Sequence, residues 1–300
     1  MPGAQRSTFD ASRFTSNARL IAAGLKRPIM NQPGTTLPTL TGKLLAIKEG
    51  HIGWIIFNNP DKHNAVSMEM WQSVPMAFDA FNKDPDVRVI ILKGAGEKAF
   101  VSGADISQFK ERRSSAEGIA EYNATADKAA EAIRNCPKPT IAMVRGYCIG
   151  GGAATATNCD IRIVADDAKF GVPAGKLGLG YRYPGVKRLT DLVGPHFTAE
   201  IFFTARQFNA QEALMMGLVN RVVPVAELET TVREYADNIG RNAPLTLAAI
   251  KRSLQEYAKD DNARDLAACD KMVNDCFASD DYKEGQTAFM EKRKPVFKGR

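Results

Sequence analysis

The sequence of 300 residues has few of the side chains that hold metal ions or build disulfide frameworks. Its five cysteines are odd in number and include no Cys-x-x-Cys pair, which argues against both a disulfide framework and a zinc site. The three histidines stand alone, without the spacing of metal ligands. We therefore expect no metal centre, and thiols that stay reduced in an intracellular compartment.

Long hydrophobic runs are also missing. No apolar stretch approaches the roughly 20 residues that a membrane-spanning helix needs, so no membrane partner is expected. Hydrophobic residues make up 44% of the chain and charged residues 25%, which is ordinary for a globular enzyme. The length is sufficient for one large domain or two smaller ones with a real core.

Acidic residues are almost absent from residues 1–40, where Asp10 is the only one against five basic residues. This segment holds +4 of the net charge of +6, which leaves +2 for residues 41–300. No helical stretch shows a lysine-rich cluster, and no aromatic residues are interleaved with basic ones as a stacking platform requires. We therefore expect no nucleic-acid partner.

Residues 1–40 are rich in Ser, Thr, Arg, Pro and Gly. This composition fits a disordered extension or a transit peptide, and Met30 as the true start of the chain is a third reading. A transit peptide would direct the protein to the mitochondrial matrix. Without one, we expect the protein in the cytoplasm.

From Lys43 onward, short apolar strands alternate with helical patterns, which predicts an α/β fold. The pattern is almost wholly helical beyond Pro224, so we expect an α/β core over 41–228 and a helical region over 229–300. The apolar faces of these expected helices favour a role in oligomerisation. The expected strands cover 44–48, 52–57, 87–93, 99–102, 140–144 and 161–165, and the expected helices begin near 67, 119, 151, 210, 226, 245, 266 and 283.

Two glycine-rich segments carry the most information. The first, Val101–Ile106, reads Val-Ser-Gly-Ala-Asp-Ile, and the second, Gly146–Gly152, ends in Gly-Gly-Gly. Each ends a strand-like run in small residues and opens a helical pattern, which leaves backbone N–H groups uncovered at a helix N-terminus. Two such groups converging on one point would form an oxyanion hole, which stabilises negative charge on a carbonyl oxygen.

These segments, in this order and spacing, resemble the crotonase (enoyl-CoA hydratase/isomerase) superfamily. The resemblance runs from about Leu44 to Arg300 and includes Asn58-Asn59-Pro60 and Cys159-Asp160. It implies a spiral of repeated ββα units and C-terminal helices that build trimers or hexamers. It also implies an acyl-CoA substrate, with coenzyme A as part of the substrate and no permanently bound cofactor, and makes the N–H groups of Ala104 and Gly151 the oxyanion donors.

The sequence departs from the resembled hydratases at two positions. Those enzymes carry a glutamate two residues after the last Gly of the Gly-Gly-Gly turn and another just after Phe-Gly-x-Pro, where this chain has Ala154 and Ala174. Hydration needs one group to activate water and one to deliver a proton, and alanine does neither. We therefore expect lyase (decarboxylase) chemistry first, isomerisation second and plain hydration last. A non-catalytic acyl-CoA binder is the alternative.

The following loop offers Tyr181 and Arg182 as other polar groups. The position of Tyr181 matches a tyrosine of the resembled methylmalonyl-CoA decarboxylases, although those have His at the Ala104 position. Tyr181 could protonate an enolate, or simply pack in a wall. Arg182 could pair with a substrate carboxylate, or form a surface ion pair, and it replaces the Asp of the resembled dienoyl-CoA isomerases.

The resemblance also assigns residues to coenzyme A. By motif position, Lys62 and Ala65 flank the nucleotide, Ala104 to Ile106 line the adenine side, and Phe289 and Lys292 contact the coenzyme A of a neighbouring subunit. Asp105 could act as a general base, but a helix cap is favoured for it. A structural role through capping or turn chemistry is expected for Asp160.

Overall fold

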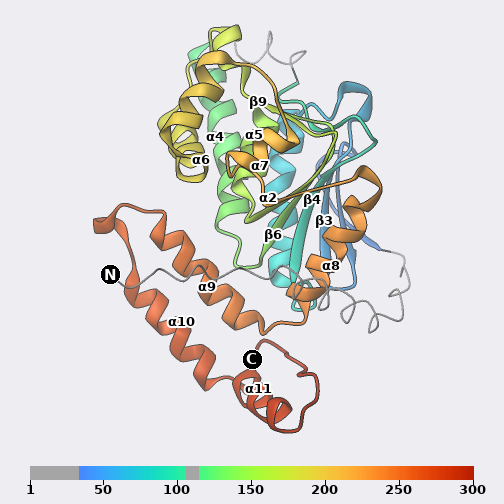
Figure 1. Cartoon of the computed structure of the whole chain (residues 1–300), viewed down its shortest axis with the longest axis vertical. Coiled ribbons are helices and arrows are strands. Elements are labelled where there is room, and N and C mark those ends of the chain that lie inside the picture. The colour runs from blue at the N-terminus through green and yellow to red at the C-terminus, as the bar shows by residue number, and fades with distance from the viewer. Residues whose placement is uncertain (1–33, 106–114) are drawn as a thin grey trace, which may run out of the picture. The chain divides into compact units, whose positions relative to one another are not determined.

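A computed structural model of the chain describes residues 34–105 and 115–300. These residues form one compact unit that contains a seven-stranded and a four-stranded sheet (Figure 1). The strand order is β1-β2-β3-β4-β6-β8-β11 in the larger sheet and β10-β9-β7-β5 in the smaller one. Strands and helices alternate along the chain, so the α/β prediction is confirmed.

The larger sheet begins with a hairpin. β2 (Leu44–Glu49) and β3 (Ile52–Phe57) pair antiparallel around a turn at Gly50, whose φ of 57° suits glycine. The parallel strands β4 (Val89–Gly94), β6 (Thr140–Val144), β8 (Ile161–Ala165) and β11 (Arg221–Val223) follow across the sheet.

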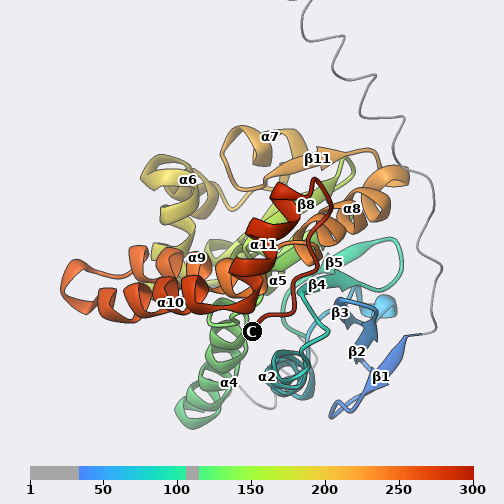
Figure 2. The same ribbon diagram turned by 90° about the horizontal axis from the view of Figure 1, so that it is seen from below.

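β1 (Thr35–Leu37) pairs antiparallel with β2 at the sheet edge (Figure 2). This strand falls within residues 1–40, the segment that was expected to be an extension or a transit peptide. Residues 34–40 therefore belong with the sheet, whereas residues 1–33 lie outside the described part of the chain.

The smaller sheet supplies the second strand of each ββα unit in the spiral that the resemblance implied. β5 (Ala99–Val101), β7 (Tyr147–Ile149) and β9 (Lys169–Gly171) each directly follow a strand of the larger sheet, and they pair parallel with one another. The two-residue β10 (Phe208–Asn209) pairs antiparallel with β9. After each strand pair the chain enters a helix, so the ββα unit repeats as the resemblance implied. Those helices are α4 (Ala116–Arg134), α5 (Gly151–Asn158) and, after a short 3₁₀ turn, α6 (Tyr183–Thr204).

Alternate residues of each central strand face opposite sides of the larger sheet, as β geometry requires. On one side Ile90 and Leu92 pack in the main core with Phe78 and Phe81 of α2 (Met68–Lys83). α2 begins where predicted, because the Ser67 side chain accepts a hydrogen bond from the Met70 amide.

On the other side of the sheet lies α8 (Leu228–Gly240) (Figure 1). Val232 and Ala236 of this helix are fully buried with Val89 and Ile91 of the sheet. The expected helical region over 229–300 is therefore divided, because its first helix packs as part of the α/β body.

The remaining helices are α9 (Pro244–Tyr257), α10 (Leu266–Ala278) and α11 (Asp280–Met290), which lie together at one end of the unit (Figures 1 and 2). α9 is joined to the α/β body through Lys251, whose Nζ donates to an Asp160 carboxylate oxygen at 2.8 Å. The same oxygen accepts from the Thr140 amide at 2.7 Å. Asp160 therefore has the structural role that was predicted for it.

Two local predictions are confirmed near α7 (Ala210–Met215). Asn209 caps this helix, and the Glu212 side chain accepts a hydrogen bond from the Asn209 amide in return. Gly217, which follows the helix, has a φ of 77°. In the part of the chain that is described, no helix has the length and apolar character needed to cross a membrane.

Candidate active site

The two glycine-rich segments meet at one edge of the smaller sheet. β5 and β7 are neighbouring parallel strands, so the loops after Val101 and Ile149 leave the sheet on the same side. A Cβ atom built on Gly151 would lie 3.7 Å from the Cα of Gly103. A Cβ on Gly152 would collide with the Val101 carbonyl oxygen, so glycine is required there for α5 to approach β5.

The backbone around Ala104 leaves its own amide out of the ladder. Val66 forms a parallel bridge opposite Ala104, in which the Val66 amide donates to the Gly103 oxygen at 2.9 Å and the Asp105 amide donates to the Val66 oxygen at 3.0 Å. In this pairing the central residue points its N–H away from its partner strand. Within residues 34–105 and 115–300, the Ala104 amide donates to no other backbone group.

Gly151 is the first residue of α5, so its amide has no acceptor one turn earlier in the helix. It too makes no backbone hydrogen bond to the residues that the structure describes. Ala104 and Gly151 both line a cavity of about 430 Å³. The structure therefore brings two uncommitted amides to one cavity, and the positive end of the α5 dipole adds to their field.

The cavity walls come from α4, α5, the 3₁₀ turn η4 (Pro173–Leu177) and the start of α6. Ala154 in the first turn of α5 and Ala174 in η4 both line it. The only carboxylate in the described lining is Asp127 of α4. The two alanines therefore face the same cavity as the two amides, and no other carboxylate of the described lining replaces the missing glutamates.

Tyr181 and Arg182 also line this cavity, so all four predicted catalytic residues come together. The Tyr181 ring packs edge-on against Phe202, with ring centroids 4.7 Å apart. Burial raises the pKa of the Tyr181 hydroxyl, and the charge of Arg182 offsets part of that shift. Tyr181 thus keeps its proton more firmly than an ordinary tyrosine.

Arg182 is engaged within the protein. Its two terminal nitrogens donate to the two oxygens of Asp127 at 2.7 and 2.6 Å, and this hydrogen bonding raises the pKa of Arg182. Both side chains are about half exposed. Of the two roles expected for Arg182, the structure shows the surface ion pair, in which a partner 55 residues earlier fills its planar fork.

Two aromatic residues of the cavity were missed as site residues. Trp71 was predicted only as part of an amphipathic helix, yet its ring lies 3.5 Å from the Cβ position of Gly151. The Trp71 indole N–H donates to the Tyr122 hydroxyl at 3.1 Å. Helical spacing alone could not separate Trp71 from the core, since both the core and the cavity lie under the same face of α2.

Apart from Ala104, the predicted coenzyme A residues that the structure describes lie outside the lining of this cavity. The Lys62 ammonium donates to the buried Asp105 carboxylate at 3.0 Å, which links two predicted nucleotide-side residues. Ala65 is almost fully buried. Phe289 is 82% exposed at a different surface, on α11, and Lys292 follows that helix. Ile106, and with it the helix that Asp105 was expected to cap, is outside the described residues.

Comparison with known proteins identifies the family. A family model described as enoyl-CoA hydratase/isomerase matches residues 48–300. The chain belongs to the enoyl-CoA hydratase/isomerase family. A short-chain-enoyl-CoA hydratase of Clostridium acetobutylicum is 37% identical over 247 residues, which are 82% of this chain and 94% of the relative. A carnitinyl-CoA dehydratase of Escherichia coli is 37% identical over 260 residues, 84% of this chain and 97% of the relative.

Solved structures of the enoyl-CoA hydratase/isomerase family share this fold. An enoyl-CoA hydratase/carnithine racemase from Magnetospirillum magneticum superposes with a TM-score of 0.81 at 35% identity, covering 87% of this chain and 97% of that one. Membership of this family makes an acyl-CoA thioester the substrate and requires no permanently bound cofactor. The residues described include no cluster of side chains that could hold a metal ion.

Proposed function

We propose that this family member is an acyl-CoA lyase that works through a thioester enolate, with decarboxylation as its first candidate reaction. The observation that carries the proposal is the pairing of two free amides, of Ala104 and Gly151, with alanine at positions 154 and 174 in the same cavity. The amides can stabilise an enolate oxygen. The alanines can neither activate a water molecule nor deliver a proton to the substrate, and hydration needs both.

Decarboxylation needs no general base. The bond between the α-carbon and the carboxylate breaks, and its electron pair forms the carbon–carbon double bond of the enolate while CO₂ leaves. The carbonyl electron pair moves onto the thioester oxygen, opposite the amides of Ala104 and Gly151. Tyr181 then gives its proton to the α-carbon, the thioester is restored, and the tyrosinate regains a proton from water. Its raised pKa keeps the hydroxyl protonated at neutral pH, so the proton is present when the enolate forms.

Incubation with methylmalonyl-CoA, crotonyl-CoA and a β-hydroxyacyl-CoA, followed by mass spectrometry of the products, tests this proposal. We expect loss of CO₂ from methylmalonyl-CoA to exceed hydration of crotonyl-CoA. Ordinary hydratase turnover of crotonyl-CoA would overturn it. An isomerised product without loss of mass would move the assignment to isomerisation, the second candidate reaction.

A non-catalytic acyl-CoA-binding protein is the second candidate, and the Arg182–Asp127 pair favours it. That pair occupies both the only carboxylate of the described cavity lining and the predicted carboxylate-binding arginine. Tight binding of acyl-CoA esters with no turnover of any of the three test thioesters would support this candidate instead.

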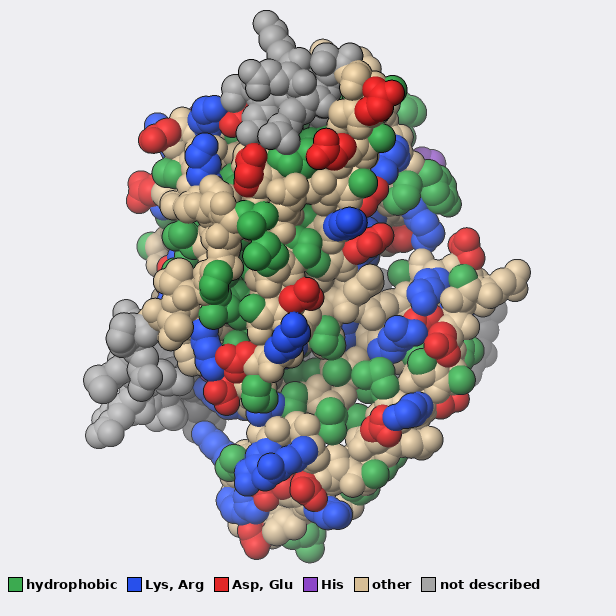
Figure 3. Space-filling view, turned by 180° about the vertical axis from the view of Figure 1, so that it is seen from behind, with side chains coloured by type: hydrophobic (Ala, Val, Ile, Leu, Met, Phe, Trp, Pro, Cys, Tyr) green, Lys and Arg blue, Asp and Glu red, His purple; other side chains and the backbone are tan. Residues whose placement is uncertain are grey.

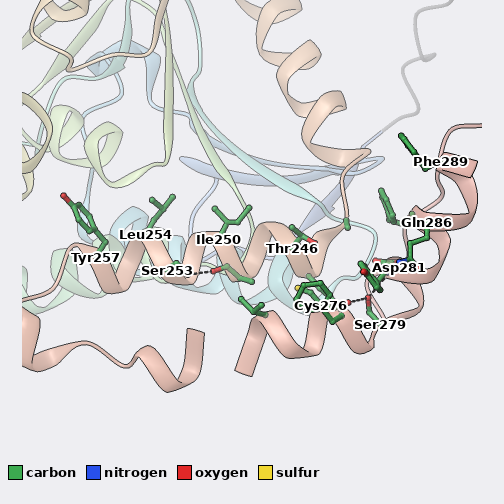
Figure 4. A pocket seen from close by; sticks show the side chains of 18 residues that line it. Thr246, Ile250, Ser253, Leu254, Tyr257, Cys276, Ser279, Asp281, Gln286 and Phe289 are labelled. Carbon is green, nitrogen blue, oxygen red and sulfur yellow. Dashed lines mark hydrogen bonds between the residues drawn. The ribbon is translucent and has the colours of Figure 1, made fainter. Parts of the chain in front are cut away.

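We also propose that the protein assembles as a trimer or hexamer through α9–α11. These helices line an apolar groove of about 920 Å³, with Ile250 and Leu254 along α9 and Phe289 of α11 at one end (Figure 4). Ile250 and Leu254 are more than half exposed in the single chain. Figure 3 shows hydrophobic side chains gathered in the hollow beside these helices. A second copy would cover them and bring Phe289 and Lys292 to the coenzyme A of its neighbour.

A further inference from the structure

Two arginines line the cavity at the end of α5 that lies away from Gly151. Arg188 of α6 donates through Nε to the Thr157 oxygen at 2.8 Å, in the last turn of α5. Arg134, the last residue of α4, donates through one terminal nitrogen to the Asn158 side-chain oxygen at 3.4 Å. The two guanidinium groups therefore lie around the same helix end.

Neither arginine has a carboxylate partner among the residues that the structure describes. Both terminal nitrogens of Arg188 are without a hydrogen-bond acceptor there. The acidic residues that act on Arg188 from a distance are already held, Asp160 by Lys251 and Asp191 by Lys187. Burial lowers the pKa of Arg188, and the charge of Arg134 lowers it further.

Capping of α5 does not account for these unused donors. At this helix end the buried Arg162 donates to the carbonyl oxygen of the C-cap Cys159 at 2.7 Å, and Arg188 caps the Thr157 oxygen through Nε alone. Arg188 therefore uses one of its nitrogens on the helix, and its terminal nitrogens have no acceptor among the described residues although the residue lines the cavity. Both arginines are half-buried, so an anion that binds between them would gain two charge-assisted hydrogen bonds and relieve their mutual repulsion.

The position of the arginines sets the length of the ligand. α5 rises about 10 Å from Gly151 to Asn158 at 1.5 Å per residue. An extended chain advances about 1.2 Å per bond, so the five bonds between the two carbonyl carbons of an adipoyl group span about 6 Å. A charge-assisted hydrogen bond adds about 3 Å at the guanidinium end. A terminal carboxylate on a six-carbon acyl chain therefore matches the separation.

We propose that Arg134 and Arg188 bind an anionic group at the far end of the acyl chain, and that the substrate class is an ω-carboxyacyl-CoA thioester. This inference rests on the proposed function only in placing the thioester carbonyl beside Ala104 and Gly151. A substrate that is decarboxylated would carry this terminal carboxylate in addition to the α-carboxylate that leaves. Adipoyl-CoA lacks the α-carboxylate, so it serves as a probe of binding at the arginines that does not react.

Isothermal titration calorimetry of the full chain with adipoyl-CoA and hexanoyl-CoA tests this inference. We expect adipoyl-CoA to bind about tenfold more tightly, since hydrogen bonds to charged groups are worth about that much or more. Arg188→Gln and Arg134→Gln should each bring the ratio of the two affinities close to one and leave hexanoyl-CoA binding within about twofold, since only a charged contact is removed. Arg241→Gln, which removes the exposed arginine directly after α8, should keep the wild-type ratio.

The ratio of two affinities on one protein sample is independent of the fraction of correctly folded variant. Equal binding of the two thioesters to the wild type would overturn this inference and leave the proposed function standing. A parallel loss of both thioesters and of free coenzyme A in the arginine variants would assign the arginines to a coenzyme A phosphate, and would also overturn it. No binding of either thioester would overturn both proposals.

Discussion

At the scale of single residues, the cavity has alanine at the two positions where the resembled hydratases have glutamate, and its wall contains the Tyr181 side chain. Tyr181 lies in the wall with a raised pKa, and Asp127 is occupied by Arg182. In the proposed reaction the proton comes from Tyr181, whose hydroxyl stays protonated at neutral pH. The proposed reaction therefore rests on two features of the cavity. The amides of Ala104 and Gly151 are present, and the two glutamates of the resembled hydratases are missing.

Tyr181→Phe tests this role. The change removes one hydroxyl and keeps the ring that packs on Phe202, so we expect affinity for the thioester to stay within about twofold while kcat falls about 100-fold or more. Because the pKa of Tyr181 is raised, its deprotonation should not reduce wild-type activity below about pH 10. Steady-state kinetics across pH measures both effects, and an equal loss of kcat and affinity would remove Tyr181 from the chemical step.

The double substitution Ala154→Glu with Ala174→Glu tests the reason for the expected lack of hydration. Both side chains line the cavity, so two carboxylates there should supply the missing acid and base and raise crotonyl-CoA hydration about 100-fold or more. The matched Ala154→Gln with Ala174→Gln variant has the same shape without the ionisable group and should stay at the wild-type level. Equal rates in the glutamate and glutamine variants would contradict this explanation.

At the scale of elements, sequence reasoning succeeded where a pattern was long or carried its own cap. The strands over 140–144 and 161–165 and the capped start of α2 were predicted within a residue. It failed for β7 and β9, because three residues between turns are too few to show alternation. Their pairing with β5, which brings the two glycine-rich loops together, is set by tertiary structure.

The partners of side chains were the hardest part of the site to predict. The Arg182–Asp127 pair joins residues 55 positions apart, and the Trp71–Tyr122 hydrogen bond joins residues 51 apart. No local pattern specifies either contact. Motif position was enough to bring Ala104, Gly151, Ala154 and Ala174 to one cavity, because strand order fixes where those loops emerge.

The contact between α5 and β5 gives a prediction at this scale. Gly152→Ala places a Cβ atom against the Val101 carbonyl oxygen, so α5 must shift, and we expect a loss of about 1–3 kcal/mol in the free energy of unfolding. Urea denaturation followed by circular dichroism measures it. Gly42→Ala is the matched control, since no atom lies within 4 Å of its added methyl group and it should change stability little. An unchanged urea midpoint for Gly152→Ala would show that α5 can move away from the Val101 carbonyl oxygen at little cost.

At the scale of the whole molecule, the described unit combines a buried α/β body with helices whose apolar faces are open. On the face shown in Figure 3, acidic and basic side chains are interspersed, whereas hydrophobic side chains gather beside the C-terminal helices. Phe277 of α10 and Phe289 of α11 are 59% and 82% exposed. An apolar surface of this kind is typical of a face that another chain covers.

Assembly through this face is tested by Ile250→Asp with Leu254→Asp, which puts two charges into the groove of Figure 4. Both side chains are already exposed in the single chain, so the monomer should keep its fold, while a desolvated carboxylate at an interface costs several kcal/mol. Analytical ultracentrifugation should find the wild type as a trimer or hexamer and this variant as a monomer. Asn274→Asp adds a charge at an exposed position of α10 outside the groove and should assemble normally. A wild type that sediments as a monomer at micromolar concentration would contradict assembly through α9–α11, and Phe289 and Lys292 would then have no route to a neighbour's coenzyme A.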